Sequence, residues 1–394
     1  MNIFLKIALT CLSFRRASAL LCATLIGSLY VPADAQSWGP GYQYDLGWNP
    51  SVAADEYDTT IVEVHNGNFY PGTLWYHVGQ AGPQVVSWGP SYSYGWGYNP
   101  AVAVAFTWVG DVAVEIDSED SSGTYPLLYR SGLVSGQTIV WSHYNYLAAA
   151  GLNPQVAISG NTVIEVHNAL PTGGPLMYTV GHVGYTGQTP SVTWGPTYQY
   201  DWGFNPSIAI TPYNSEIVIA EAHNGSATPG PMWYHVGFWT GGTTVSWHGA
   251  YQYDWGWNPK VAFNLAALPN RFTDFPLLAE VHNGNGTGGP MWYNVGEWRG
   301  GNAFQWSGAS QYDRGYNPVV AIGGTGTSSY AVELHNGWNV AGPLWYHEIV
   351  SESCCGPSHR ERLPHRASRG ALFRTGSTAA PMSIGALLSR LAVR

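Results

Sequence analysis

The sequence predicts an all-β protein, a six-bladed β-propeller with four-stranded blades, and three observations support this fold class. The first is a repeat of about 52 residues, since Asn-Pro recurs at 49–50, 99–100, 153–154, 205–206, 258–259 and 317–318. The second is that each repeat holds four short alternating or β-branched segments separated by Gly, Pro or Asn. The third is size, because four strands in roughly 50 residues match one propeller blade.

The order of residue types within the repeat predicts how the ring is built. The first segment is always small and aliphatic, as in Val52-Ala53 and Val102-Ala103. Side chains of that size suit the innermost strand, which lines the narrow axis of a propeller. A Trp marks the fourth segment six times, and the first copy, Trp38, precedes the first Asn-Pro. We therefore expect the N-terminal strand to complete the last blade and to close the ring without a free edge.

The first 35 residues have the pattern of a secretory signal peptide. Basic residues precede an apolar run at 19–31, and Ala33-Asp34-Ala35 follows as a small-residue cleavage site. The apolar run is short for a membrane span. The pattern predicts secretion to the extracellular space or the periplasm, with no stable membrane insertion after cleavage; an uncleaved membrane anchor is the alternative.

The remaining chain divides into the predicted propeller, 36–350, and a tail, 351–394. The tail is rich in Arg, Ser and Pro and is predicted to be disordered. The propeller segment contains only five basic residues against 21 acidic ones, so its negative field disfavours nucleic acid as a partner. It contains no cysteine, so its fold needs no disulfide and no thiolate-bound metal.

A nonapeptide, YQYDWGWNP at 251–259, recurs with little change at 198–206 and 42–50. We interpret it as the loop between blades, in which Asp-x-Gly forms a turn and Asn-Pro starts the inner strand. Exposed aromatic rings beside carboxylate and amide groups suit sugars, whose C–H faces stack on the rings. Turn formation alone is the alternative role for the Asp. The ligand contacts predicted from this segment are Asp201, Trp202, Asp254, Trp255 and Trp257.

A second motif, Glu-x-His, recurs on the second strand, and a Trp recurs on the third. The Glu and His project to the same face of a strand, and we predict that they form the floor of pockets between blades, below the Trp. A buried framework of paired polar groups is the alternative. The predicted residues are Glu63, His65, Glu221, His223, Glu280, His282, Glu333 and His335, with Trp75, Trp233, Trp292 and Trp345.

The same motif gives little support for a metal or a cofactor. One Glu and one His per blade are too few ligands for a metal ion, so none is predicted. The acidic segments 55–58 and 117–120 are candidates for Ca²⁺, with solvated surface charge as the simpler interpretation.

The repeated pattern resembles the secreted lectin-type β-propellers, which include fungal and bacterial fucose-binding lectins. The resemblance covers 36–350 and rests on an x-P-x-V-A strand, a V-E-V-H strand, an L-W-Y-H strand and a closing Trp. It implies that glycans bind between adjacent blades near the loops. The fucose-binding version places an Arg beside a Glu and an aromatic in each site, and this chain has no repeating Arg.

Repeated sites of one kind favour multivalent binding over catalysis, which needs one asymmetric group of residues. We therefore expect a secreted carbohydrate-binding protein that is not an enzyme and needs no cofactor. The alternatives are a protein-interaction scaffold and a propeller glycoside hydrolase or lyase, whose carboxylates would meet across blades. Blades two and three depart from the repeat, with Gly95, Arg130 and Met177 at motif positions, so sites beside them are expected to be weak or absent.

Overall fold

The computed structural model describes residues 38–68, 71–82, 85–171, 173–263, 276–286, 288–324 and 330–350. The predicted signal peptide and the predicted tail lie outside these residues. Within them the chain forms 22 strands, and no helix is long and apolar enough to cross a membrane. The strands are β1 (Tyr42–Ala54), β2 (Thr60–Asn66), β3 (Gly72–Gln80), β4 (Ser87–Trp88), β5 (Tyr92–Thr107), β6 (Gly110–Ser118), β7 (Pro126–Ser135), β8 (Thr138–Trp141), β9 (Asn145–Ala150), β10 (Leu152–Ser159), β11 (Thr162–Asn168), β12 (Gly174–Thr186), β13 (Thr189–Tyr213), β14 (Glu216–Asn224), β15 (Gly230–Trp239), β16 (Ser246–Phe263), β17 (Leu277–Asn283), β18 (Gly289–Trp298), β19 (Phe304–Trp306), β20 (Ser310–Gly323), β21 (Tyr330–Asn336) and β22 (Gly342–Val350).

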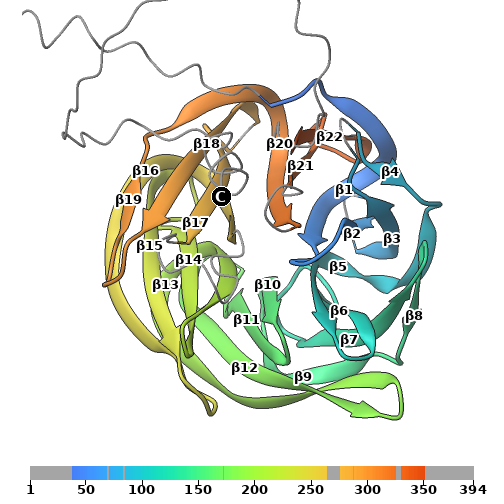
Figure 1. The fold of residues 1–394 in the computed structure, drawn as a ribbon. Coiled ribbons are helices and arrows are strands. Elements are labelled where there is room, and N and C mark those ends of the chain that lie inside the picture. Colours follow the sequence, from blue (N-terminus) through green and yellow to red (C-terminus); the bar gives the residue numbers. More distant parts are fainter. Residues whose placement is uncertain are drawn as a thin grey trace, which may run out of the picture. The chain divides into compact units, whose positions relative to one another are not determined.

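The described strands pair into six four-stranded antiparallel sheets arranged around one axis (Figure 1). Each sheet runs from an inner strand to an outer one, and the outer strand continues as the inner strand of the next sheet or leads directly into it. The prediction of an all-β propeller is confirmed. In order, the sheets are β1–β2–β3–β4/β5, β5–β6–β7–β8/β9, β10–β11–β12–β13, β13–β14–β15–β16, β16–β17–β18–β19/β20 and β20–β21–β22–β1.

The N-terminal strand closes the ring, as predicted. The outer half of β1 pairs with β22, with Tyr42 opposite Tyr346. The preceding Trp38 is buried, and its ring centroid lies 5.6 Å from that of Tyr312. Pairing the two ends of the propeller segment in one sheet leaves neither as an open edge.

The nonapeptide predicted as a loop is instead part of a strand, which is a correction to the sequence interpretation. In β16, Gln252 pairs with Trp233 on β15, whereas Lys260 pairs with Val281 on β17. The segment therefore serves first as the outer strand of one sheet and then, from Trp257 on, as the inner strand of the next. Its alternating Tyr and Trp residues favour this extended form, since aromatic side chains suit a pleated surface.

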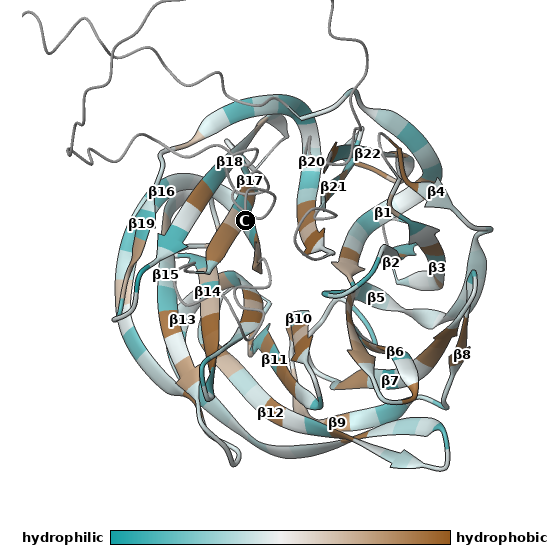
Figure 2. Cartoon of the chain, viewed as in Figure 1, coloured by the Kyte–Doolittle hydropathy of each residue, from teal (hydrophilic) through white to brown (hydrophobic). Residues whose placement is uncertain are grey.

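The inner halves of the long strands carry the small residues predicted to face the axis. Copies such as Ala53, Ala103 and Ala157 line a narrow axial space. Figure 2 shows the change along β20, from hydrophilic in its outer half to hydrophobic in its inner half. The large apolar side chains instead fill the spaces between sheets, where residues such as Ile164 and Ile219 are fully buried.

Candidate functional site

The turn into each inner strand is formed by the Asn of Asn-Pro in the left-handed conformation. All six copies have φ between 49° and 54°, and Asn tolerates this region better than most residues. Most of these turns are held by an Asn that ends the second strand of the preceding sheet. Asn224, for example, accepts a hydrogen bond from the Asn258 backbone N–H at 2.8 Å and donates to the Gly256 carbonyl at 3.0 Å. The sequence pattern H-N-G therefore positions the Asn-Pro turn.

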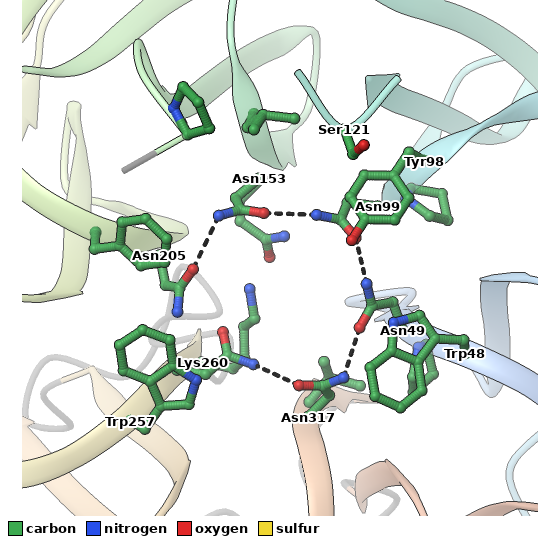
Figure 3. A pocket seen from close by; sticks show the side chains of 18 residues that line it. Trp48, Asn49, Tyr98, Asn99, Ser121, Asn153, Asn205, Trp257, Lys260 and Asn317 are labelled. Atoms are coloured by element: carbon green, nitrogen blue, oxygen red, sulfur yellow. Dashed lines mark hydrogen bonds between the residues drawn. The ribbon is translucent and has the colours of Figure 1, made fainter. Parts of the chain in front are cut away.

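These turns direct the six Asn side chains toward the axis, where they form a nearly complete ring of amides (Figure 3). Each link runs from the Nδ2 of one Asn to the Oδ1 of the next. An amide has two N–H groups and two acceptor lone pairs, so one link in each direction leaves capacity for a ligand. The links are Asn49 to Asn99, Asn99 to Asn153 at 2.6 Å, Asn153 to Asn205 at 2.9 Å, Asn258 to Asn317 at 3.4 Å and Asn317 to Asn49 at 2.6 Å.

The amide ring lies in a cavity of about 360 Å³ at the end of the axis. Aromatic side chains from just before the Asn-Pro turns form its walls, and the rings of Phe204 and Trp257 stack with centroids 5.5 Å apart. A volume of this order lies within the range of small-ligand sites, roughly 300–1,000 Å³. The other lining residues that carry polar or aromatic groups are Trp48, Tyr98, Ser121, Gln155 and Lys260.

Lys260 is the one cationic side chain among the residues that line this cavity. Burial lowers the pKa of its ammonium group to about 7. At neutral pH the cavity therefore holds a mixture of the charged and neutral amine. The equivalent positions in the other repeats carry Ser51, Ala101, Gln155, Ser207 and Val319.

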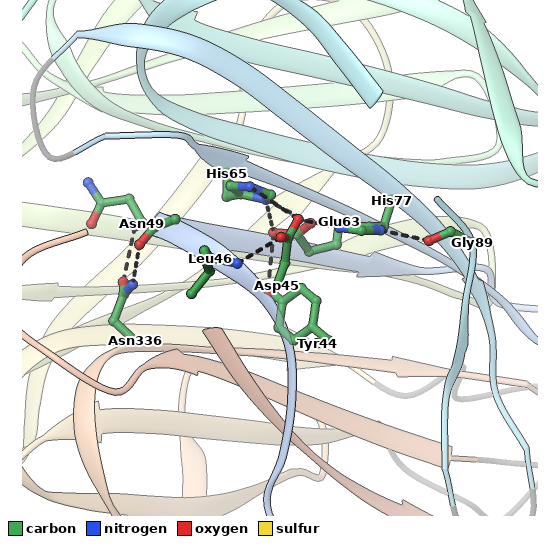
Figure 4. A network of polar contacts seen from close by, with 10 residues as sticks. Tyr44, Asp45, Leu46, Asn49, Glu63, His65, His77, Gly89 and Asn336 are labelled. Atoms are coloured by element: carbon green, nitrogen blue, oxygen red, sulfur yellow. Dashed lines mark hydrogen bonds and ion pairs between the residues drawn. The ribbon is translucent and has the colours of Figure 1, made fainter. Parts of the chain in front are cut away.

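A second polar cluster lies between neighbouring sheets and includes the predicted Glu-x-His motif (Figure 4). Tyr44 donates to Glu63 at 3.2 Å, and Glu63 accepts from His65 Nδ1 at 3.1 Å. Asp45, from the outer half of β1, lies 3.7 Å from His65 Nε2 and 2.7 Å from His77 Nε2. The cluster thus joins a Glu, two His and an Asp from two neighbouring sheets.

Asp45 and His77 change each other's pKa. Burial favours the neutral acid, but hydrogen bonds from His77 and from the Leu46 N–H lower the pKa of Asp45 to about 2. Burial likewise favours a neutral His77, yet its hydrogen bond to Asp45 and the charge of Glu63 raise its pKa above the usual value. His77 and Asp45 therefore each shift the pKa of the other toward its charged form.

The same arrangement recurs at two further interfaces. Asp201 lies 3.6 Å from His223 and 2.8 Å from His235, and Asp313 lies 3.9 Å from His335 and 2.7 Å from His347. At a fourth interface an Asn replaces the second His, and Asn294 Nδ2 donates to Asp254 at 2.7 Å.

The structure places the predicted Glu and His residues in the interior. These eight side chains, Glu63, His65, Glu221, His223, Glu280, His282, Glu333 and His335, are all buried. Their hydrogen bonds are made within the protein, and only the Asp of each cluster reaches the surface in part. That placement fits the framework alternative, in which buried polar groups satisfy one another.

The predicted Trp residues fall into three groups. Trp75, Trp233, Trp292 and Trp345 are half-buried and pack against a hairpin glycine; a side chain at Gly225 would lie 2.8 Å from Nε1 of Trp233. Trp202 and Trp255 are exposed, at 63% and 61%, on the outer halves of β13 and β16. Trp257 alone lines the axial cavity.

Sequence reasoning missed the amide ring, Lys260 and the second His of each cluster. The ring depends on how far apart the six turns lie, which no local pattern gives. The second His had a signal, because W-Y-H recurs on the third strand and ends at His77, His235 and His347. Its role in the cluster depends on its contact with the Asp of the neighbouring sheet and on the Glu of the adjacent strand.

No family model matches this sequence, and no curated protein is similar enough in sequence to count as a relative. Solved structures with a similar fold include AofleA from Arthrobotrys oligospora, at 11% identity and a TM-score of 0.50, covering 79% of this chain and 85% of that one. Trypanosoma rangeli sialidase has 10% identity and a TM-score of 0.48, over 79% of this chain. NanB sialidase from Streptococcus pneumoniae, as a single-residue variant, has 8% identity and a TM-score of 0.49, over 80% of this chain and 71% of that one.

These similarities concern the fold. The match spans 58% of the T. rangeli sialidase chain, so a large part of that sialidase has no counterpart in the present chain. The prediction that the protein is not an enzyme is contradicted by this comparison, because sialidases are glycoside hydrolases. Since one fold can carry many unrelated functions, a repeated architecture is no ground for excluding catalysis.

Proposed function

We propose that the protein binds carbohydrate, with the axial cavity as its principal site. The observation that carries this proposal is the composition of the cavity: aromatic walls surround a ring of amide side chains, with one amine beside it. Aromatic faces stack against the C–H face of a sugar, and amides both donate to and accept from hydroxyl groups. A neutral or weakly acidic glycan fits such a lining better than a strongly charged ligand.

Exposed Trp side chains extend this surface beyond the cavity. Trp255 precedes the cavity residue Trp257 by two positions on β16, and Trp202 precedes Phe204 in the same way on β13. Both lie toward the same end of the sheets as the amide ring. We infer that they contact further residues of an oligosaccharide, each between two neighbouring sheets, so that repeated weak contacts add to binding at the axis.

The test is a glycan array probed with the labelled full chain, followed by calorimetric titration of any oligosaccharide that binds. We expect Trp257→Ala to weaken binding most, by tenfold or more, and Trp202→Ala or Trp255→Ala to weaken it less. Trp108→Ala is the matched control, because Trp108 is 72% exposed and lies outside the proposed surface. Chromatography of the same mixtures reports whether the bound oligosaccharide is cleaved.

Two results would overturn the proposal. An array without specific binding by a folded protein would remove carbohydrate as the ligand and shift attention to a protein partner. Binding that Trp257→Ala leaves unchanged, while Trp202→Ala or Trp255→Ala abolishes it, would exclude the axial cavity and move the site to the spaces between sheets.

A further inference from the structure

We propose that two of the inter-sheet clusters, Asp201/His223/His235 and Asp313/His335/His347, each bind a divalent transition-metal ion such as Zn²⁺. In each cluster one carboxylate oxygen and two imidazole nitrogens lie within 4.8 Å of one another. Two His and one carboxylate form a ligand set that Zn²⁺ and related ions accept, with further positions left for water. The Glu-x-His motif alone offers one His per blade, too few ligands for a metal, whereas the fold supplies two His and adds an Asp.

The hydrogen bonds of the two imidazole nitrogens in the Asp313 cluster favour a metal site. His335 Nδ1 lies 3.1 Å from Glu333, and His347 Nδ1 lies 2.6 Å from the Gly39 carbonyl oxygen. Both partners only accept hydrogen bonds, so each Nδ1 carries a proton. The Nε2 atoms are then the nitrogens that face Asp313, and something positive must lie between their lone pairs and its carboxylate. A proton on Nε2 is one solution, and a metal ion is the other.

The surroundings of three of these four imidazoles, those of His223, His335 and His347, match those of metal-bound histidine. A ligating His usually donates its second N–H to a carboxylate or a backbone carbonyl, which fixes the ring and its tautomer. The Asp313 cluster has one of each. In the Asp201 cluster, His223 Nδ1 donates to Glu221 at 3.1 Å in the same way. The buried Glu of the repeated motif thus acts as a positioning residue for the first His.

The clusters are open to solvent at one end. The two His of each are buried, but the side chains of Asp201 and Asp313 are 27% and 39% exposed. An ion can therefore enter past the Asp without opening the fold. The metal ion and a proton compete for the same imidazole nitrogens, so binding should weaken as the pH falls.

The chain contains its own matched comparison. At the fourth interface the equivalent residues are Asp254, His282 and Asn294. Asn294 supplies an N–H to the carboxylate but no imidazole nitrogen, so this cluster has one ligand fewer. Asn at this position is compatible with the fold, which makes His→Asn a safe way to remove a site and Asn294→His a way to add one.

The experiment is isothermal titration of the full chain with ZnCl₂ at pH 7.5, in two buffers of different ionisation enthalpy. We expect His235→Asn and His347→Asn each to remove one equivalent of bound Zn²⁺ and the double variant to remove two. Asn294→His should add one equivalent. Measuring changes in stoichiometry, and not totals, separates these sites from the His and Cys residues beyond 350. The difference between the heats in the two buffers reports the number of protons released as the ion binds.

Either of two results would overturn the proposal. If the double variant, with an unchanged circular dichroism spectrum, binds as many equivalents as the native chain, the clusters hold protons and no metal. If Asn294→His folds normally and adds no equivalent, this arrangement of two His and one Asp is insufficient for Zn²⁺.

Discussion

The interface between the third and fourth sheets and the interface between the first and second occupy equivalent places in the ring but hold different buried charges. In the former, Glu221, His223 and His235 meet Asp201. In the latter, Arg130 on β7 takes the place of the second His and lies 3.0 Å from Glu115 and 3.6 Å from Asp117. Each interface thus places a basic side chain beside two acidic ones.

Two departures from the repeat at this interface, Gly95 in place of Asp and Arg130 in place of His, are sterically compatible with each other. A side chain at Gly95, where other repeats have Asp, would lie 2.8 Å from the Arg130 guanidinium. That guanidinium donates to the Tyr94 carbonyl at 2.7 Å and lies over the Tyr94 ring. What looks like degeneration in the sequence is an exchange of one polar network for another. The comparison teaches that these buried positions change as a set, since a partial change would leave a carboxylate without a cation.

Arg130→His should have the largest effect, because an imidazole lacks the several N–H groups with which the guanidinium reaches Glu115, Asp117 and the Tyr94 carbonyl together. Removing one partner of a buried ion pair costs about 3–5 kcal/mol. Urea unfolding followed by Trp fluorescence measures the loss. The triple variant Gly95→Asp, Asp117→His, Arg130→His should recover much of it by rebuilding the network of the other sheets. A triple variant less stable than Arg130→His alone would contradict the exchange of complete sets.

Asp201→Ala tests the regular interface in the same way. It removes the acceptor of His235, whose pKa the hydrogen bond to Asp201 raises against the effect of burial. Hydrogen bonds to charged groups contribute about 1.5–3 kcal/mol, and we expect a loss in that range at pH 6. Asp201→Asn keeps an acceptor oxygen and should cost less. Equal losses in the two variants would show that side-chain packing, and not the hydrogen bond, stabilises this position.

Lys260 is a single-copy departure at the axis, and its effect should depend on pH. Burial lowers its pKa from 10.5 to about 7, so the unfolded chain binds more protons than the folded one between those values. The stability of the native chain relative to Lys260→Met should therefore rise as pH increases from 7 to 10 and should be flat below 7. The ceiling is about 5 kcal/mol at 1.4 kcal/mol per pKa unit, and water in the open cavity should reduce the change to about 1–2 kcal/mol. A pH-independent difference between the two urea midpoints would exclude a depressed pKa.

His235→Asn should have the smallest effect, because it converts a regular cluster into the natural arrangement around Asn294. One hydrogen bond to the Asp replaces another, so we expect a change below about 1 kcal/mol in the absence of metal. Thermal unfolding with EDTA present measures it. A loss as large as that of Asp201→Ala would show that the two interfaces differ in more than this side chain.

The candidate site was predictable only in part. Trp257 was expected to contact a ligand and does line the cavity, and Glu-x-His was expected between sheets and lies there. Lys260 gave no signal, since it is one variable residue after an Asn-Pro. The second His is a repeated residue in the sequence, but its partner Asp belongs to a neighbouring sheet. Its role follows from the distance of less than 3 Å between its Nε2 and the Asp carboxylate.

The sequence by itself determined the all-β propeller, the closing role of the N-terminal strand and the small residues at the axis. These follow from periodicity and side-chain size, which act within one repeat. Only the tertiary structure decided that the nonapeptide is a strand shared by two sheets, that six Asn amides meet at the axis, and that Asp201 joins His223 and His235. Those features depend on the register between strands and on the closure of the ring, which bring together residues about 20 to 270 positions apart.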